Sequence, residues 1–535
     1  MFEQYVDKNI DFFPNGKLFR IIFDNISCKF RLLARNNSDL EKIVKDFSVE
    51  NTSSFFVKQH GYSAESKLYI INKFGFFSVG LFFEVLQWIK LHFGTINCVA
   101  ISNNVNSFLE DFLMPLKTFA KRHNRETFEI SNISKKYELR DYQKEIIKSI
   151  IFDGFGKGLF ESPTGSGKSF VIANFIYTLQ QQYDASLKFL IFVPNRQLVE
   201  QFYTDLLDYG FKQETITRFT AGLKKNNAFN KDAKIIIANR QYIFKNLNKL
   251  PKIDCLIADE CHSISYGSST FEFVENLNAK FKIGCSGTIP RDKYQKFNLI
   301  GLFSKIIYTE DIVNLQNRGF ISQLKINIIN IIDKEVNENK DLLFNIDSTQ
   351  KYVEGGNIGF NDSYDAEIEY IGKNYRKLYT PVLNEINKLN GNVLVLFDRI
   401  EFGKNMYSYS NETKIRNSEH FYIDGSTKVE DRENIRKLLE QSNNNILFAE
   451  SAVFSTGINI RNLNNIVFMF SGKSFYRICQ AIGRTLRLHK DKEYAQLIDV
   501  VFSFKYSRKH FKERMKIYRE MYNKYKPDNL IKIEI

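Results

Sequence analysis

The stretch SPTGSGKS at residues 162–169 decides the fold of this chain. It follows a short apolar run, GLF at 158–160, which predicts a strand, and it precedes FVIANFI at 170–176, which predicts a helix. A strand, a glycine-rich loop and a helix in this order form a phosphate-binding loop, whose backbone N–H groups face a polyphosphate. Lys168 would then reach the β- and γ-phosphates, and the Ser169 hydroxyl would hold Mg²⁺. Because a serine replaces the first glycine of the usual pattern, a plain Gly/Ser turn remains the alternative for the loop taken alone.

Around this loop, from residue 137 onward, apolar runs alternate with helical stretches, a pattern typical of parallel α/β sheets. Each run ends at a polar cluster, and in open α/β sheets the sites lie at the carboxyl ends of the strands. A second set of alternating runs begins near residue 324. The expected strands are 189–193, 235–238, 255–258 and 282–286 in the first set, and 325–332, 393–397, 421–423, 446–449, 466–468 and 495–499 in the second.

We expect four parts along the chain. Residues 1–130 form a small α+β domain without a catalytic constellation, expected to bind the substrate. Residues 131–322 and 323–504 form two α/β lobes, and residues 505–535 form a basic C-terminal helix. The segment 334–363 is rich in Asn, Asp, Glu and Gly, and it predicts a mobile insertion in the second lobe.

The N-terminal part has a simple pattern of elements. The expected strands are 18–23, 28–33, 55–58, 68–72 and 96–101, and a helix is expected over 78–93. A capping box at Ser38–Glu41 predicts a short helix that runs through Phe47. Basic and aromatic residues could contact nucleic acid, although such residues are more often ordinary surface and core; they are Lys58, His60, Tyr62, Lys73 and Phe74.

Composition narrows the class of protein. The chain has 535 residues and a net charge of +14, which suits a polyanionic partner such as nucleic acid, although an AT-rich genome also yields such a composition. The six cysteines are scattered without a C-x-x-C pair, which argues against a zinc site or a disulfide framework and favours a reducing cytoplasm. The N-terminus lacks signal-peptide features, and the most apolar run, 74–89, is too short to span a bilayer.

Two carboxylates follow the expected strand 255–258. Asp259 and Glu260 open the sequence DECH at 259–262. At a strand terminus opposite a phosphate loop, Asp259 would bind Mg²⁺ and Glu260 would orient and deprotonate an attacking water. An isolated Asp-Glu pair is more often two solvated acids, but the strand before it and the loop upstream favour the catalytic interpretation.

A pair of arginines stands in the second lobe, in QAIGRTLR at 480–487. Arg484 and Arg487 are three residues apart, so we expect them to share one helix face. Guanidinium groups delivered to a γ-phosphate stabilise the charge that develops on it, and arginine can make bidentate contacts with phosphate. The alternative is a pair of surface arginines on an exposed helix. Since the pair lies far along the chain from Lys168, the prediction requires two domains that close on one nucleotide.

Taken together, eight motifs in this order resemble those of a superfamily 2 helicase. They are LRDYQ at 139–143, the loop at 162–169, VPNRQLVEQ at 193–201, ANRQ at 238–241, DECH at 259–262, SGT at 286–288, FSTGIN at 454–459 and QAIGRTLR at 480–487. Within the superfamily the chain is most similar to the UvsW-type helicases of tailed phages. That similarity rests on VFSTGI at 453–458, QAIGRTLR at 480–487 and, more faintly, GFFSVGL at 75–81. In the motor, the resemblance covers about residues 137–500.

The resemblance implies two RecA-like lobes around ATP and Mg²⁺, and it assigns roles to residues of this chain. The implied catalytic residues are Lys168, Asp259, Glu260, Gln480, Arg484 and Arg487. The implied ATP contacts are Arg140, Gln143, Pro163, Thr164, Gly165, Ser166, Gly167, Lys168, Ser169 and Gly457, and Ser169 and Asp259 hold the metal. The implied nucleic-acid contacts are Arg196, Asn239, Arg240, Gln241, Arg399, Ser455 and Thr456. His262, Ser286, Gly287 and Thr288 would couple the nucleotide state to lobe closure.

The resemblance further implies 3′→5′ movement on branched DNA, namely forks, Holliday junctions and R-loops with RNA–DNA hybrids. We expect a monomer in the cytoplasm, which is the host cytoplasm for a phage protein, without a membrane partner. Three other readings remain open: a duplex translocase that does not separate strands, a nucleic-acid binding or annealing module with a vestigial ATPase, and an RNA helicase.

Overall fold

The computed structural model describes residues 17–24, 27, 29–51, 66–96, 98–101, 115–122, 128–223, 229–335, 362–455, 460, 462–469, 472, 474–489 and 492–535. The strand expected at 55–58, with Lys58, His60 and Tyr62, lies outside these residues. Residues 336–361, which are most of the insertion expected at 334–363, also lie outside the described residues. Among the described residues, no helix is both long and apolar enough to cross a bilayer.

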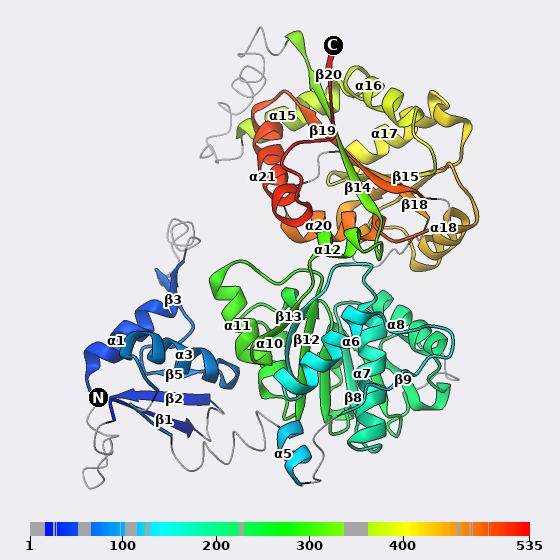
Figure 1. Ribbon diagram of the computed structural model, residues 1–535. Coiled ribbons are helices and arrows are strands. Elements are labelled where there is room, and N and C mark those ends of the chain that lie inside the picture. Colours follow the sequence, from blue (N-terminus) through cyan, green and yellow to red (C-terminus); the bar gives the residue numbers. More distant parts are fainter. Residues whose placement is uncertain are drawn as a thin grey trace. The chain divides into compact units, whose positions relative to one another are not determined.

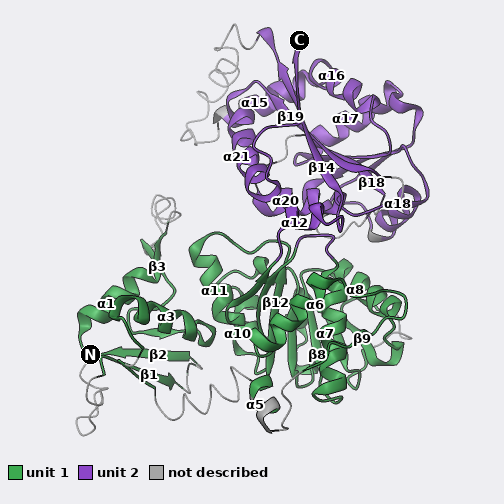
Figure 2. Cartoon of the chain, in the orientation of Figure 1, with its two compact units in different colours: residues 1–162, 167–309 green, residues 163–166, 310–535 purple. Residues whose placement is uncertain are grey.

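The chain divides into two compact units (Figure 2). The first contains residues 1–162 and 167–309, and the second contains residues 310–535 together with residues 163–166 of the glycine-rich loop. Each unit contains one seven-stranded sheet whose pairings are all parallel, with helices packed around it (Figure 1). The expected pair of α/β lobes is therefore confirmed.

The N-terminal domain is a small α+β domain built on a mixed sheet of order β5-β2-β1-β6. β1 (Phe19–Asp24) and β2 (Lys29–Ala34) form the expected antiparallel pair. The other strands of this sheet are β5 (Phe76–Phe77) and β6 (Val99–Ile101). A second, two-stranded sheet pairs β3 (Ser48–Glu50) with β4 (Lys67–Tyr69).

Its helices are close to those expected. α1 (Asn37–Asp46) begins one residue before the predicted capping box, with Asn36 at the N-cap, so the box itself is not formed. The helix expected over 78–93 is a short 3-10 helix, η2 (Val79–Leu81), that continues into α3 (Phe82–Phe93).

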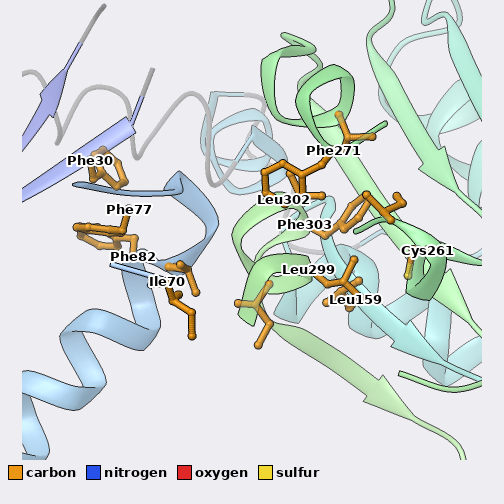
Figure 3. Packing of buried hydrophobic residues seen from close by; sticks show 14 of the residues in the cluster. Phe30, Ile70, Phe77, Phe82, Leu159, Cys261, Phe271, Leu299, Leu302 and Phe303 are labelled. Carbon is orange, nitrogen blue, oxygen red and sulfur yellow. The ribbon is translucent and has the colours of Figure 1, made fainter. Parts of the chain in front are cut away.

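The N-terminal domain shares one hydrophobic core with the first lobe (Figure 3). η2 lies against α11 (Lys293–Phe303), and a Cβ atom added at Gly80 would come within 2.3 Å of the Ile300 carbonyl oxygen. The Ser78 hydroxyl donates to Glu275 Oε1 at 2.7 Å, and the rings of Phe47 and Phe297 meet edge to face with their centroids 5.4 Å apart. Backbone contact, a hydrogen bond and ring packing thus join the domain to the first lobe.

The first lobe has the strand order β13-β7-β12-β11-β8-β10-β9. Its central strands 189–193 and 255–258 are apolar and buried along their whole length, as parallel strands covered on both faces require. The strands are β7 (Lys157–Glu161), β8 (Phe189–Val193), β9 (Ile216–Phe219), β10 (Ile235–Asn239), β11 (Cys255–Ala258), β12 (Phe281–Ser286) and β13 (Ile306–Thr309). α7 (Lys168–Gln182) follows β7, and α8 (Arg196–Tyr209) follows β8.

The second unit has the strand order β16-β17-β15-β18-β19-β14-β20. Six of these strands match the expected runs: β14 (Gln323–Ile332), β15 (Asn392–Phe397), β16 (His420–Ile423), β17 (Ile446–Glu450), β18 (Leu463–Met469) and β19 (Tyr494–Phe502).

The prediction of one helix over 505–535 is wrong beyond residue 522. α21 (Lys505–Tyr522) ends at Asn523, which adopts a left-handed conformation with φ of 51°. The chain then forms β20 (Asn529–Glu534), which pairs in parallel with β14.

A buried ion pair attaches α21 to the second sheet. The Arg514 guanidinium donates to both carboxylate oxygens of Asp499 on β19, at 2.8 and 2.7 Å, and the Tyr518 hydroxyl donates to the same carboxylate at 2.7 Å. Asp499 is 0% and Arg514 3% exposed, so water cannot replace a lost partner. Tyr518 and Tyr522 of this helix are both buried.

Replacing Asp499 with alanine is expected to destabilise the second unit by about 3–5 kcal/mol, because it leaves the Arg514 charge buried without its carboxylate. Hydrogen exchange of the β19 and α21 amides in the full chain measures this effect. Lys516→Ala is the matched control on the same helix, since it removes only a surface ion pair with Glu513 and should change stability by less than about 1 kcal/mol. Equal exchange in the two variants would contradict the prediction.

Candidate nucleotide site

The glycine-rich loop leads from β7 into α7 as the sequence predicts. Gly167 is the N-cap of α7 and has φ of 85°, a conformation that glycine adopts without strain. The Lys168 ammonium donates to the Ser162 carbonyl at 3.0 Å, so the lysine side chain folds back along the loop. The Gln143 amide lies beside the loop, since a Cβ atom added at Gly167 would be 2.6 Å from Gln143 Nε2. Gln143 also accepts a hydrogen bond from the Arg140 backbone N–H at 3.0 Å, which fixes the start of α6 (Asp141–Lys148).

Asp259 directly follows β11, at the carboxyl edge of the first sheet. Its side chain is buried, and it accepts a hydrogen bond from Cys285 Sγ at 3.3 Å. Burial, together with the neighbouring charge of Glu260, raises the pKa of Asp259 to about 6, and the charge of Lys168 acts in the opposite direction. The charge of Lys168 is thus felt at Asp259, which puts the loop lysine and the strand-end carboxylate in one electrostatic environment.

Glu260 has the left-handed backbone conformation, with φ of 49°. Such a conformation is uncommon for a residue other than glycine and costs of order 1–3 kcal/mol. The Arg240 guanidinium holds the turn, because it donates to the carbonyls of Glu260 at 3.2 Å and Ser263 at 3.3 Å. Arg240 is itself buried, and burial lowers its pKa. The resemblance implies that Arg240 contacts nucleic acid, and that role stays a prediction beside this bracing contact.

His262 links the DECH turn to the SGT motif. Ser286 Oγ donates its proton to the Thr288 carbonyl at 2.7 Å and accepts from the Thr288 N–H at 3.1 Å. Because that hydroxyl has a single proton, His262 Nδ1, at 2.8 Å, must be the donor in its contact with Ser286. The same nitrogen lies 3.3 Å from Glu260 Oε2. His262, Ser286 and Thr288 are therefore connected by hydrogen bonds, and the Ser162 N–H donates to the Ser286 carbonyl at 3.0 Å.

Tyr209 lies beside the site, although no sequence pattern points to it. Its hydroxyl lies 2.9 Å from Ser169 Oγ, and it comes from the last residue of α8. Burial raises the pKa of Tyr209 above its ordinary value, which keeps the phenol protonated. A single tyrosine at a helix end has no sequence signature, so only the packing of α8 against α7 reveals it.

The expected arginines of the second unit lie at the end of α20 (Phe475–Thr485). Arg484 is in the helix, with its guanidinium 5.5 Å from the Phe454 ring centroid. The prediction that Arg487 shares its helix face is wrong, because the helix ends at Thr485. The carbonyls that follow the helix accept hydrogen bonds from Ser322. The Leu486 carbonyl accepts from the Ser322 N–H at 2.7 Å, and the Arg487 carbonyl accepts from the Ser322 hydroxyl at 3.3 Å.

The remaining expected site residues fall into three groups. Arg196, Gln241 and Arg399 are exposed, and Asn239 is buried beside Arg240. Gln480 is partly buried on α20. Thr456 and Gly457 lie outside the described residues, as does the side chain of Ser455.

The residues of the first lobe fit Mg²⁺ bound together with a nucleotide. Magnesium prefers hard oxygen ligands and is usually held by one or two protein groups plus substrate phosphates. Asp259 offers a carboxylate in the electrostatic range of Lys168. The Ser169 hydroxyl can donate its proton to Tyr209 and keep its lone pairs for a cation. Among the described residues, no group of three or more His, Cys, Asp or Glu side chains could form a metal site by itself.

Replacing Asp259 with asparagine is expected to stabilise the first unit at pH 7 by about 1–3 kcal/mol. The pKa of Asp259 in the folded chain is about 6, above that of an ordinary aspartate. Between about pH 4 and 6, Asp259 is therefore protonated in the folded chain but already ionised in the unfolded chain. Ionised Asp259 therefore costs stability above pH 6, and the gain from the substitution should vanish near pH 4. Thermal unfolding at the two pH values measures it. The exposed Asp153 supplies the control Asp153→Asn, and an equal gain there would refute the explanation.

A loop lysine, a strand-end carboxylate pair and a hydrogen-bonded DECH–SGT link on a parallel sheet, with a second parallel sheet following, define a two-lobed RecA-like ATPase. Two family models match the chain. The model described as "Type III restriction enzyme, res subunit" matches residues 136–291, and the one described as "Helicase conserved C-terminal domain" matches residues 377–489. One model matches each lobe, so the chain has the domain organisation of a superfamily 2 helicase.

Known proteins show the same similarity. The "ATP-dependent DNA helicase uvsW" of Enterobacteria phage T4 is 27% identical over 382 residues, which are 70% of this chain and 70% of that protein. The ATP-dependent Type ISP restriction-modification enzyme LlaBIII, solved bound to DNA, has a similar fold, with a TM-score of 0.53 and 15% identity over 82% of this chain and 34% of LlaBIII. Dbp5 of S. cerevisiae, solved with RNA and ADP BeF3, gives a TM-score of 0.50 and 13% identity over 79% of this chain and 94% of Dbp5.

Proposed function

We propose that this helicase uses ATP and Mg²⁺ to move 3′→5′ along DNA and to remodel branched DNA, namely forks, Holliday junctions and R-loops. The observation that carries the DNA assignment is the similarity to the T4 helicase over 70% of both chains. The electrostatic coupling of Lys168 to Asp259 supports the ATPase part. Neither the direction of movement nor the preferred branch follows from geometry, and both come from the family resemblance.

In this proposal each lobe supplies part of one nucleotide site. Lys168 and the loop 162–169 hold the phosphates, Ser169 and Asp259 hold Mg²⁺, and Glu260 orients the attacking water. Gln480, Arg484 and Arg487 of the second lobe meet the γ-phosphate when the lobes close. Gln143 and Arg140 would contact the adenine. Closure and opening then alternate with ATP binding and hydrolysis.

The strand contacts would be made mainly with phosphates. Arg196 and Gln241 of the first lobe and Arg399 of the second are exposed and available for such contacts. Ser455 and Thr456 are further proposed contacts in the second lobe. Backbone contacts carry no sequence information and weaken as salt rises. Binding should therefore depend on DNA structure and ionic strength rather than on sequence.

One experiment tests the proposal. Strand displacement is measured with ATP on forked DNA carrying either a 3′ or a 5′ single-stranded arm, on a Holliday junction and on an R-loop, with blunt duplex as the control. The proposal expects separation of the branched substrates and of the fork with the 3′ arm. No separation of any branched substrate, with DNA-stimulated ATP hydrolysis intact, would overturn it.

A second candidate is a translocase that moves on duplex DNA without separating its strands. The match of residues 136–291 to a restriction-enzyme subunit favours it. Displacement of a triplex-forming strand from blunt duplex, without unwinding of forks, would select this candidate. Absence of DNA-stimulated ATP turnover would instead select a binding or annealing module.

A further inference from the structure

A tight turn at Asn72–Gly75 projects from the N-terminal domain between β4 and β5. The Asn72 side-chain oxygen accepts hydrogen bonds from the N–H groups of Phe74 and Phe76, both at 2.9 Å. The Asn72 backbone closes the turn, because its carbonyl accepts from the Gly75 N–H at 2.9 Å and its N–H donates to the Phe76 carbonyl at 3.0 Å. Four hydrogen bonds within five residues fix the conformation of the turn.

The turn also packs closely on β2, its neighbour in the sheet (Figure 1). The Leu32 N–H donates to the Gly75 carbonyl at 2.9 Å. Gly75 has φ of 80°, and a Cβ atom there would be 2.2 Å from the Leu32 carbonyl oxygen, so only glycine fits. Arg31 Nε donates to the Phe74 carbonyl at 3.2 Å, and its guanidinium lies 5.0 Å from the Phe76 ring centroid.

This rigid turn presents an aromatic ring beside two cations. The Phe74 side chain is 53% exposed. Lys73 is exposed next to it, with its ammonium 5.2 Å from the Tyr69 ring centroid, and Arg31 lies on the adjacent strand. No Asp or Glu occurs from residue 66 to residue 83 or from residue 29 to residue 34. The surroundings of the ring along both segments are therefore positively charged.

We propose that the Phe74 ring stacks on an unpaired base of a nucleic-acid strand, while Lys73 contacts a phosphate of the same strand. This inference rests on the proposed function and adds a contact outside the motor lobes. Every base has a π-face, so an exposed aromatic ring binds an unpaired base without regard to sequence. A ring on a fixed turn loses little conformational freedom when it stacks. The bases within an intact duplex are already stacked, so the contact selects the single-stranded arm of a branch.

Substitutions in the full-length protein separate stacking from charge. Phe74→Ala should weaken binding of a forked oligonucleotide about tenfold, and Phe74→Leu should weaken it nearly as much, because leucine is apolar without a π-face. Lys73→Ala should lower the slope of log affinity against log salt by about 0.7, whereas Phe74→Ala should leave that slope unchanged. Phe152→Ala is the matched control, since Phe152 is also an exposed phenylalanine of the same unit. Wild-type affinity in Phe74→Ala, or in Phe74→Leu, overturns the proposal.

Trp88 is the single tryptophan of the chain. Once it is replaced, the fluorescence of a tryptophan introduced at position 74 can report stacking directly. In a Trp88→Phe background, Phe74→Trp places a lone indole at the turn, and Phe152→Trp is its control. Single-stranded oligonucleotide should quench the fluorescence of Phe74→Trp and leave that of Phe152→Trp unchanged. No quenching at position 74 overturns the stack even if the variant binds DNA. Absence of DNA-stimulated ATP hydrolysis in the wild-type protein would overturn the proposed function. DNA-stimulated ATP hydrolysis in the wild type together with no quenching at position 74 would overturn only this inference.

Discussion

Lys168→Ala is expected to lower DNA-stimulated ATP hydrolysis by about 10²–10³-fold while DNA binding stays within about twofold of the wild type. The ammonium is positioned in the loop by the Ser162 carbonyl, 3.0 Å away, and its charge reaches Asp259. A positive charge held beside the transferring phosphoryl group stabilises charge that develops in the transition state, and alanine supplies none. The strand contacts proposed for Arg196, Gln241 and Arg399 do not involve this side chain. Steady-state turnover and fluorescence anisotropy of a labelled fork measure the two effects.

Lys212→Ala is the matched control for this experiment. Lys212 is an exposed lysine of the same unit, so its loss changes the net charge by the same amount and should leave turnover unaffected. Turnover retained in Lys168→Ala would overturn the assignment of the nucleotide site to the loop 162–169. Loss of DNA binding together with turnover would show that the lysine supports the fold instead.

Arg484→Ala is expected to lower kcat for ATP by about 10³–10⁵-fold with little change in KM. In the proposed cycle this guanidinium meets the γ-phosphate only when the lobes close, so it acts on the transition state more than on bound ATP. Arg484→Lys should recover little of the loss, because an ammonium cannot make the bidentate contact. Arg508→Ala on α21 removes an exposed arginine of the same unit and serves as control. An unchanged kcat in Arg484→Ala would refute the two-lobe site.

The central strands of both sheets could be predicted because burial on both faces demands continuous apolar runs. FLIFV in β8 and NVLVLF in β15 are examples, and both are buried throughout. In the two seven-stranded sheets, the strands that the sequence failed to predict are β9, β13 and β20, and all three lie at sheet edges. An edge strand has a neighbour on one side only, so it tolerates polar residues; in β20, for example, the polar and charged residues Asn529, Lys532 and Glu534 interrupt the apolar pattern.

The site could be predicted in its motifs but not in its contacts. Sequence order places Asp259 and Ser286 at strand ends, and parallel pairing brings these ends to one edge of the sheet. The bracing of the Glu260 turn by Arg240 and the contact of Tyr209 with Ser169 depend on which helix packs beside which strand. The end of α20 before Arg487 depends likewise on bonds to Ser322, 165 residues earlier in the chain. Local patterns contain no information on these distant partners.

The core that the N-terminal domain shares with the first lobe limits how the protein can be shortened. On α11, Ile300 is 3% exposed and its backbone lies against Gly80, and the Phe297 ring packs on the Phe47 ring. A fragment beginning near residue 131 would present this apolar side of α11 to water, and contiguous apolar patches of that kind promote aggregation. Studies of the isolated motor would therefore need polar replacements on α11 to keep the fragment in solution.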